Sequence, residues 1–173
     1  MDLMQFDLTS LYFDEPLPVD IEQLLQDASN CYSATDCQAE ALLLRAYFLA
    51  PEQLVVLVAL YRYYFYQHRL EDALLVADRA MTIVARRLDL PAKWQQLHPD
   101  HIATAVQRSM GLLRFYLLVL KAAGYIHLRM GNAVTGQAML EKLVAVDSHD
   151  RLGGKVLLDI IVAAVATRIA DAA

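Results

Sequence analysis

Apolar residues recur along most of this chain at the three- and four-residue spacings that place side chains on one face of a helix. The pattern predicts helices over about 20–28, 37–49, 52–68 and 70–88, then from about 100 to 130 with a kink at Gly111, and over 155–170. Leu and Ala dominate, while the chain has only six Gly and five Pro. This composition favours helix and opposes a many-stranded sheet. The sequence therefore predicts an all-α protein.

Two of the expected helices carry the same small-residue pattern. The two copies, 34 positions apart, are Ala39, Arg45, Ala46 and Ala73, Arg79, Ala80. A period of 34 residues is the length of one helix–turn–helix repeat. The segments AEALLLRAYFLAP and DALLVADRAMTIV resemble the second helices of tetratricopeptide (TPR) repeats, and Pro51 stands where that family places its terminal proline.

A third copy fits LKAAGYIHLRMGNAVTGQAMLEKLVAVD, where Gly124 and Gly131 match the small residue and the turn glycine of the TPR family. Here Gly136 and Leu143 replace the two alanines. The resemblance places repeats at about 20–53, 54–87 and 117–150. It implies one domain over 20–173, built as a short curved array of antiparallel helical hairpins. An arm at 1–19, an insertion at 88–116 and the helix at 155–170 complete the organisation.

The run Tyr61-Arg62-Tyr63-Tyr64-Phe65-Tyr66 is the strongest local anomaly. In the TPR register, Tyr61 and Tyr64 pack against the partner helix. The same register assigns to the concave face Tyr32, Arg62, Phe65, Tyr66, Lys121, Tyr125, Leu128 and Arg129. Tyrosine and arginine together supply contact area, hydrogen bonds and cation–π contacts. The resemblance thus implies a groove that binds a peptide or helical segment, with an aromatic-rich core as the alternative.

Charge is distributed unevenly. Residues 1–44 contain nine acidic residues and no Lys or Arg, so the rest of the chain has 11 acids (20 − 9) against 15 bases. Such a chain lacks the concentrated basic face that nucleic-acid binding needs. The acidic arm mixes its charges with Leu, Phe and Tyr. It is either a frayed terminus, or a segment that occupies a groove or a second subunit.

The predicted C-terminal helix is apolar almost all round. In VLLDIIVAAVA, Asp159 is the only charge between Lys155 and Arg168. A helix without a polar face is expected to be buried on both sides, by the 88–116 insertion or by a second subunit. The sequence therefore predicts a homodimer, with docking into a larger complex as the alternative.

Location follows from what the chain lacks. The N-terminus is acidic, unlike a secretion signal, and the longest apolar run contains Arg114 and Lys121. We therefore expect a soluble cytoplasmic protein that does not enter a membrane. In that compartment Cys31 and Cys37 are expected to be reduced.

Catalytic motifs are sparse. The chain has no Gly-rich phosphate loop and no nucleophile elbow, and His98-Pro99-Asp100-His101 fits a helix start better than a metal site. His149-Asp150 resembles the paired ligands of all-helical HD-type phosphohydrolases, for which His101 and Asp159 would have to serve as the remaining ligands. The end of a repeat is the better interpretation. We therefore expect no cofactor, no metal and no enzymatic activity, but a protein-binding adaptor or chaperone. Its layout resembles the small dimeric TPR chaperones of type III secretion.

Overall fold

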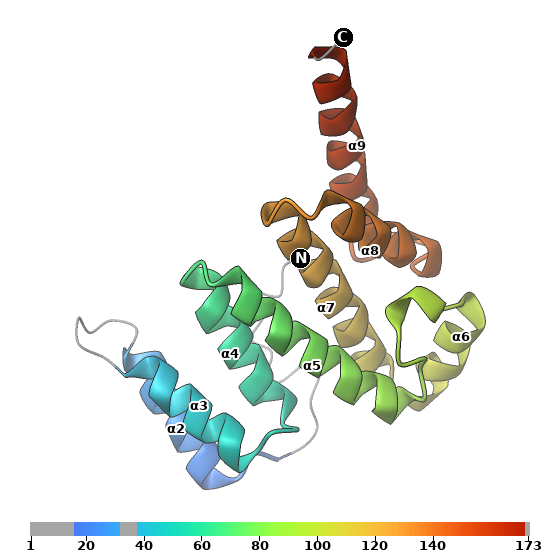
Figure 1. Ribbon diagram of the computed structural model, residues 1–173. Coiled ribbons are helices and arrows are strands. Elements are labelled where there is room, and N and C mark those ends of the chain that lie inside the picture. Colours follow the sequence, from blue (N-terminus) through green and yellow to red (C-terminus); the bar gives the residue numbers. More distant parts are fainter. Residues whose placement is uncertain (1–15, 32–37, 172–173) are drawn as a thin grey trace. The chain divides into compact units, whose positions relative to one another are not determined.

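A computed structural model describes residues 16–31 and 38–171, and side chains as far as Ala163. The part of the chain that it describes is helical throughout and contains no strand (Figure 1), which confirms the all-α prediction. The elements are α2 (Val19–Cys31), α3 (Ala39–Leu49), α4 (Leu54–Tyr66), α5 (Leu70–Leu88), the 3-10 helix η1 (Trp94–Gln96), α6 (Pro99–Arg108), α7 (Met110–Arg129), α8 (Ala133–Val146) and α9 (Gly154–Asp171).

The helices form two compact units that divide within α5, between Ile83 and Val84. The N-terminal unit contains α2, α3, α4 and most of α5. The C-terminal unit contains the last turn of α5 and all elements from η1 to α9. The prediction of one domain over 20–173 remains a prediction, and each unit is described by itself.

The N-terminal unit is a series of helices that pack on their sequence neighbours, α2 on α3 and α3 on α4. Its marked alanines are buried: Ala46 and Ala73 expose none of their surface, and Ala39 and Ala80 expose 6% and 3%. Small side chains at these positions let neighbouring helices approach closely. The turn from α4 to α5 passes through His68 at φ 58°, a left-handed conformation that ends a helix.

The C-terminal unit is organised around the hairpin of α7 and α8. The chain reverses at Gly131, whose φ of 83° suits glycine. Further along, Gly124 and Gly136 face each other across the two helices. A Cβ on Gly136 would lie 2.8 Å from the Gly124 carbonyl oxygen and 2.7 Å from Leu128 Cγ. The glycines therefore permit an approach that side chains would prevent.

The predicted kink at Gly111 is instead a full break at Ser109. This residue is extended (φ −164°, ψ 108°), ends α6 and begins α7. Its hydroxyl accepts a hydrogen bond from the Leu112 amide at 3.2 Å, which caps α7. Residues 100–130 are therefore two helices, which pack on each other.

The connector that follows α5 belongs to the C-terminal unit and holds the chain's single tryptophan, Trp94. It packs on α8 through η1. Two contacts hold the connector in place: Lys142 Nζ donates to the Leu97 carbonyl at 3.0 Å, and Arg108 pairs with Asp89 at 3.1 Å. The insertion is therefore an ordered part of this unit's packing.

In the part of the chain that the structure describes, α7 is the helix whose length and apolar composition would allow it to cross a membrane. However, 56% of its most apolar stretch is buried inside the protein, where it packs on α8 and α6. The core helices of soluble proteins can have the same length and composition. The chain is thus compatible with a soluble protein.

Cys31, the last residue of α2, is disulfide-bonded. The expectation of a reduced thiol is therefore wrong at this position. The chain's second cysteine, Cys37, lies outside the described residues.

Candidate functional site

The aromatic run lies on α4, and the helix distributes it around its axis. Tyr61 and Tyr64 are buried, with 6% and 7% of their surface exposed, whereas Tyr66 is 49% exposed. Arg62 and Phe65 are half-buried. Ring contacts link the two sides: Tyr61 stacks on Phe65 at 6.0 Å, and Phe65 meets Tyr66 edge-on at 6.1 Å. Arg62, Phe65 and Tyr66 are therefore adjacent on one helix face.

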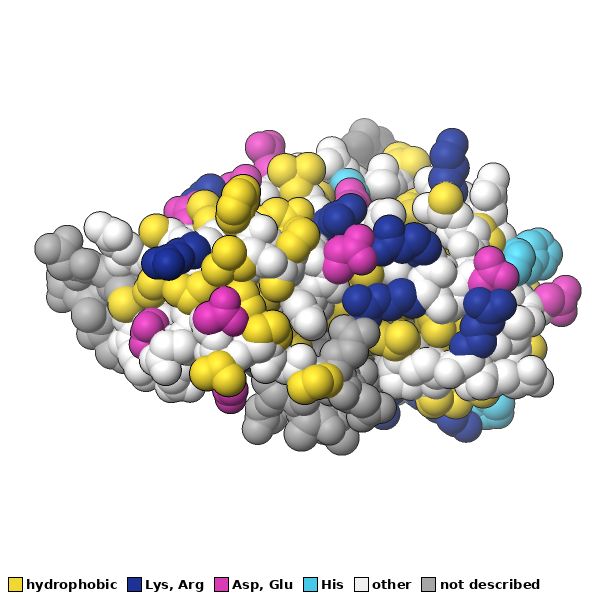
Figure 2. Space-filling view, turned by 90° about the horizontal axis from the view of Figure 1, so that it is seen from below, with side chains coloured by type: hydrophobic (Ala, Val, Ile, Leu, Met, Phe, Trp, Pro, Cys, Tyr) yellow, Lys and Arg dark blue, Asp and Glu magenta, His cyan; other side chains and the backbone are white. Residues whose placement is uncertain are grey.

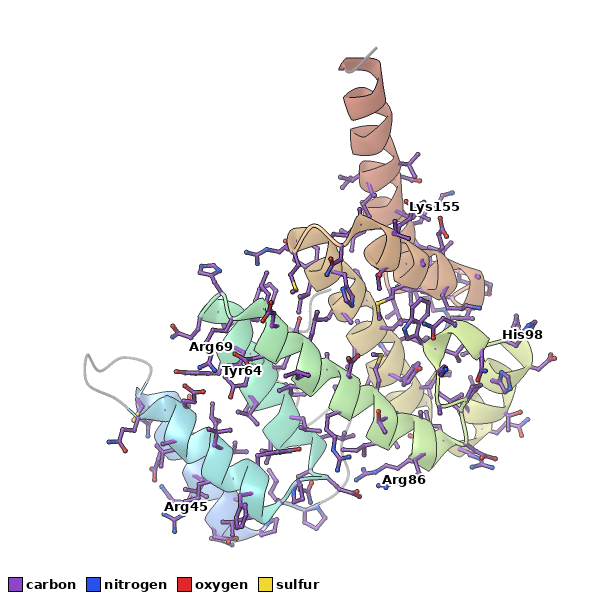
Figure 3. The ribbon with its side chains drawn as sticks, in the orientation of Figure 1. Arg45, Tyr64, Arg69, Arg86, His98 and Lys155 are labelled. Carbon is purple, nitrogen blue, oxygen red and sulfur yellow. The ribbon has the colours of Figure 1, made fainter. Side chains whose placement is uncertain are left out.

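Tyr64 is a structural residue that joins three helices. Its hydroxyl donates to Glu40 Oε1 at 3.2 Å, and Arg69 NH1 reaches the same oxygen at 2.7 Å. Arg69 also pairs with Asp72 at 2.7 Å. Figure 3 shows Tyr64 and Arg69 side by side at the turn between α4 and α5. Burial, and then the Glu40 carboxylate, raise the pKa of the Tyr64 hydroxyl above its ordinary value. The cluster fastens α3 to the α4–α5 hairpin.

The remaining predicted groove residues lie on α7, in the C-terminal unit. Tyr125 is 39% exposed and Arg129 is also exposed. Lys121 is half-buried, and its Nζ donates to the Leu152 carbonyl at 2.6 Å. Because these residues are spaced four apart, they share one face of α7. Lys121 thus has a structural role that the sequence did not predict: it holds the loop between α8 and α9.

The predicted groove residues therefore fall into two groups. Arg62, Phe65 and Tyr66 belong to the N-terminal unit, whereas Lys121, Tyr125 and Arg129 belong to the C-terminal unit. Within each unit the residues are neighbours on one helix face. Tyr32 lies outside the described residues. The groove as a whole remains a prediction.

α9 is attached to α8 at its first turn and then leaves the rest of its unit (Figure 1). Gly154 is buried, and a Cβ there would lie 2.9 Å from Leu143 Cδ2. From Lys155 to Ala163, by contrast, no described side chain is buried. Val156 and Ile160 are each 61% exposed and Val162 is 53% exposed. The expected burial by the 88–116 insertion is therefore wrong for these residues.

Loop contacts fix where α9 begins. The Leu152 amide donates to Asp147 Oδ2 at 2.9 Å, and the Lys155 amide donates to Asp150 Oδ1 at 3.0 Å. The chain turns at Asp150 and Gly153, which have φ of 46° and 65°. With the Lys121 contact, these bonds hold a short loop from which α9 projects.

A further apolar surface, which was not predicted from the sequence, lies on α3. One face of this helix is exposed along its whole length: Ala41, Leu44, Arg45, Phe48 and Leu49. Phe48 is 85% exposed. Figure 2 shows hydrophobic side chains at the surface in the left half of the view, where α2 and α3 lie in Figure 1. Apolar residues at i, i+3, i+7 and i+8, with Arg45 at i+4, were the available signal.

The histidines do not assemble into a metal centre. His98 precedes the first residue of α6, Pro99, and its amide donates to His101 Nδ1 at 3.1 Å. His149 lies in the α8–α9 loop, where Nδ1 is 3.0 Å from the Ser148 hydroxyl. Among the described side chains, no three His, Cys, Asp or Glu residues converge as metal ligands would.

Comparison with known proteins identifies one family. The chain is 48% identical, over 161 residues, to the uncharacterized 19.8 kDa protein in the nifW 5′ region of Azotobacter chroococcum mcd 1. The matched region covers 93% of this chain and 89% of that protein. The chain belongs to that protein's family. A match over nearly all of both chains means that both units are part of what the family shares.

No protein-family model matches the chain, and no solved structure matches it. The function of the family therefore has to be argued from its surfaces.

Proposed function

We propose that this protein is a non-enzymatic protein-interaction module, an adaptor or chaperone, that assembles into a homodimer through α9. The observation that carries the proposal is the exposure of Val156, Ile160 and Val162 along a helix with almost no polar face. Exposed apolar surface of this kind marks a protein–protein contact. A second copy of α9 offers the matching apolar face, as in the isologous contact of a twofold dimer.

Light scattering with size-exclusion chromatography tests the dimer. The wild-type chain should have twice the 19.4 kDa mass of one chain, and Ile160→Glu should reduce it to one chain, because a buried unpaired carboxylate opposes association. Leu75→Glu, on α5, is the matched control because Leu75 is 68% exposed and lies outside α9. A monomeric wild-type chain, or a dimeric Ile160→Glu variant, would show that the dimer proposal is wrong.

We also propose that the chain is a degenerate member of the TPR family. Three helix pairs support this: α2 with α3, α4 with α5, and α7 with α8 fall on the proposed repeats at 20–53, 54–87 and 117–150. Gly131 occupies the predicted turn between paired helices, and the alanines of the first two units are buried. An experimental structure that pairs these helices differently would contradict this assignment.

We further propose a second binding site on the predicted groove residues of α4. The accessibility of Tyr66, beside Arg62 and Phe65 on the same helix face, favours it, since tyrosine and arginine are frequent anchors in protein interfaces. We expect this site to take a peptide or helical segment of a partner protein. The double variant Arg62→Ala/Tyr66→Ala should weaken partner capture, whereas Arg151→Ala/Val134→Ala, two exposed positions elsewhere, should not.

The name of the relative suggests a first bait for that capture. It places the relative's gene in the nifW 5′ region, so the nifW product is the first candidate partner to test. Purified chain and purified nifW product should co-elute, and the co-elution should be lost in Arg62→Ala/Tyr66→Ala. Independent elution of the two proteins would remove this candidate.

We propose a cytoplasmic location, supported by the burial of the apolar α7 helix within its unit. The disulfide at Cys31 is instead commoner in oxidising compartments. Cell fractionation followed by immunoblotting tests the location: the chain should be recovered in the cytoplasmic fraction. Recovery in a membrane or extracytoplasmic fraction would contradict the proposal.

A further inference from the structure

α3 is apolar on two opposite faces, and the N-terminal unit packs against one of them. Ala39, Leu43 and Ala46 are buried, and α3 packs on α2 and α4. The opposite side, which we call the α3 face, is exposed and consists of Ala41, Leu44, Arg45, Phe48 and Leu49. A helix that is apolar on both sides is expected to be buried on both sides. Packing within the unit meets this expectation on one side.

Phe48 is the most exposed large side chain of the α3 face. It exposes 85% of its surface, against 43% for Leu44 and 50% for Leu49. Aromatic side chains that become buried on association supply much of the binding energy of an interface. From Ala41 to Leu49 the face is about 12 Å long at the helical rise per residue. Its length and shape therefore suit a helix of about two to three turns, packed ridges into grooves.

Arg45 is the single charge of the α3 face and stands at its centre. Figure 3 shows its side chain projecting from α3 away from α4. Among the described side chains, none forms an ion pair with Arg45, and Glu40, the acid of α3, is held by Arg69. A guanidinium in the middle of an apolar surface favours a partner that brings a carboxylate, because any other partner would bury the charge unpaired.

Two other occupants fit these charges less well. In a pair of α3 faces related by a twofold axis at their centre, the two Arg45 guanidinium groups would meet, and like charges oppose association. An anionic membrane is attracted by a cluster of cations, whereas the neighbouring helix α2 has three acids, Asp20, Glu22 and Asp27, and no Lys or Arg. A partner protein that carries a carboxylate is the better match.

We propose that the α3 face binds an amphipathic helix of a partner protein, whose apolar stripe covers Leu44 and Phe48 and whose carboxylate pairs with Arg45. The site lies on the side of α3 opposite its buried residues and is distinct from α9 and from the proposed site on α4. It gives the N-terminal unit a docking surface of its own.

Two synthetic peptides test the charge preference of the full-length chain. Both are fluorescein-labelled Ala/Gln helices of about 15 residues with a leucine stripe, and the centre of that stripe carries Glu in one peptide and Lys in the other. Fluorescence anisotropy should show that the Glu peptide binds about fivefold more tightly than the Lys peptide, and added salt should reduce this difference. Arg45→Glu should reverse the order of the two affinities.

Phe48→Gln tests the anchor of the same site. It should weaken the binding of both peptides about tenfold, as the loss of a central aromatic contact does. Leu75→Gln is the matched control, because Leu75 is 68% exposed on another helix, α5, and should leave both affinities unchanged. Both substituted side chains are exposed, so circular dichroism of the two variants should match that of the wild type.

Three peptide results would overturn the inference: no saturable binding of either peptide, an unchanged order of affinities in Arg45→Glu, or equal weakening by Phe48→Gln and Leu75→Gln. Two further results would overturn it in favour of another occupant. A lower mass of Phe48→Gln in light scattering would assign the α3 face to a second copy of the chain. Loss of binding to phosphatidylglycerol vesicles in that variant would assign the face to a lipid surface.

Failure of this inference would leave the proposed function open to its own tests. The dimer is measured by light scattering of Ile160→Glu, and partner capture by Arg62→Ala/Tyr66→Ala. Neither variant changes the α3 face.

Discussion

The guanidinium of Arg69 lies over the ring of Tyr64, 4.5 Å from its centroid, while both side chains reach the same carboxylate, that of Glu40. The arrangement brings together a residue from α3, one from α4 and one from the turn before α5. Because Arg69 is exposed, most of the stabilisation is expected from the buried ring of Tyr64 and only a small part from the ion pairs.

Substitution of Tyr64 should separate the ring from the hydroxyl. Tyr64→Phe keeps the packing and the cation–π contact and loses the bond to Glu40, so the free energy of unfolding should fall by about 1 kcal/mol. Tyr64→Ala removes the ring as well and should cost about 3–5 kcal/mol. Urea unfolding followed by circular dichroism measures both. Similar losses in the two variants would show that the hydroxyl, and not the ring, supports the unit.

Tyr116 should make the protein sensitive to alkali. Burial raises the pKa of its hydroxyl to about 12, above the ordinary value near 10 of the unfolded chain. Below pH 10 the Tyr116 hydroxyl keeps its proton in both the folded and the unfolded chain, so its contribution to the free energy of unfolding does not change with pH. As pH rises from 10 to 12, only the unfolded chain ionises, and stability should fall by about 1.4 kcal/mol per pH unit. Between pH 9 and 11, the free energy of unfolding of the Tyr116→Phe variant should fall by about 1.4 kcal/mol less than that of the wild type. Equal losses in denaturant titrations would contradict this.

The glycine contact between α7 and α8 should be intolerant of even one methyl group. Gly136→Ala places its Cβ 2.8 Å from a backbone oxygen and 2.7 Å from Leu128, so we expect destabilisation of about 1–3 kcal/mol despite the better helix propensity of alanine. Gly124→Ala meets its neighbours at 3.2–3.3 Å and should cost less. Thermal unfolding of both variants checks the order, and the reverse order would show that the crossing is looser than described.

Ser109 should be replaceable only by another capping residue. Ser109→Ala loses the acceptor for the Leu112 amide and should lower stability by about 1 kcal/mol, whereas Ser109→Asp should retain most of it. Chemical denaturation compares the variants. If Ser109→Ala unfolds like wild type, the break between α6 and α7 does not depend on this cap.

Lys121 should protect the loop that precedes α9. Lys121→Met removes the bond to the Leu152 carbonyl, so trypsin should cut faster after Arg151, which is exposed. Lys142→Met is the matched control, since Lys142 holds the Leu97 carbonyl in the η1 connector. Mass spectrometry of timed digests measures the rate at this site. An unchanged rate in Lys121→Met, or an equal rise in both variants, would argue against the clamp.

Local patterns in the sequence predicted most of the helices. Helix bounds and the buried positions of Ala39, Ala46, Ala73 and Ala80 follow from a 3.6-residue period, because both depend on residues within one or two turns. The split of the YRYYFY run into buried Tyr61 and Tyr64 and accessible Tyr66 has the same origin. These features need no knowledge of the rest of the chain.

The features that the sequence did not predict depend on distant residues or weak signals. α5 continues without a break through the point where the two units divide. The division depends on which helices pack together, so no residue within α5 marks it. Ser109 ahead of Leu112 and Leu113 is a legible cap signal, whereas the prediction placed a kink at Gly111. Lys121 was predicted as a groove residue, but its Nζ donates to a carbonyl 31 positions away. No local pattern in the sequence could show this structural contact.

The position of Trp94 gives the protein an intrinsic optical probe. As the single tryptophan, it lies in the η1 connector of the C-terminal unit, whereas helical ellipticity arises from both units. A denaturation curve recorded by tryptophan emission therefore follows one half of the molecule, and a curve recorded by circular dichroism follows the whole. Coincident midpoints would mean that the continuous helix α5 couples the halves into one cooperative transition, and separated midpoints would give each half its own stability.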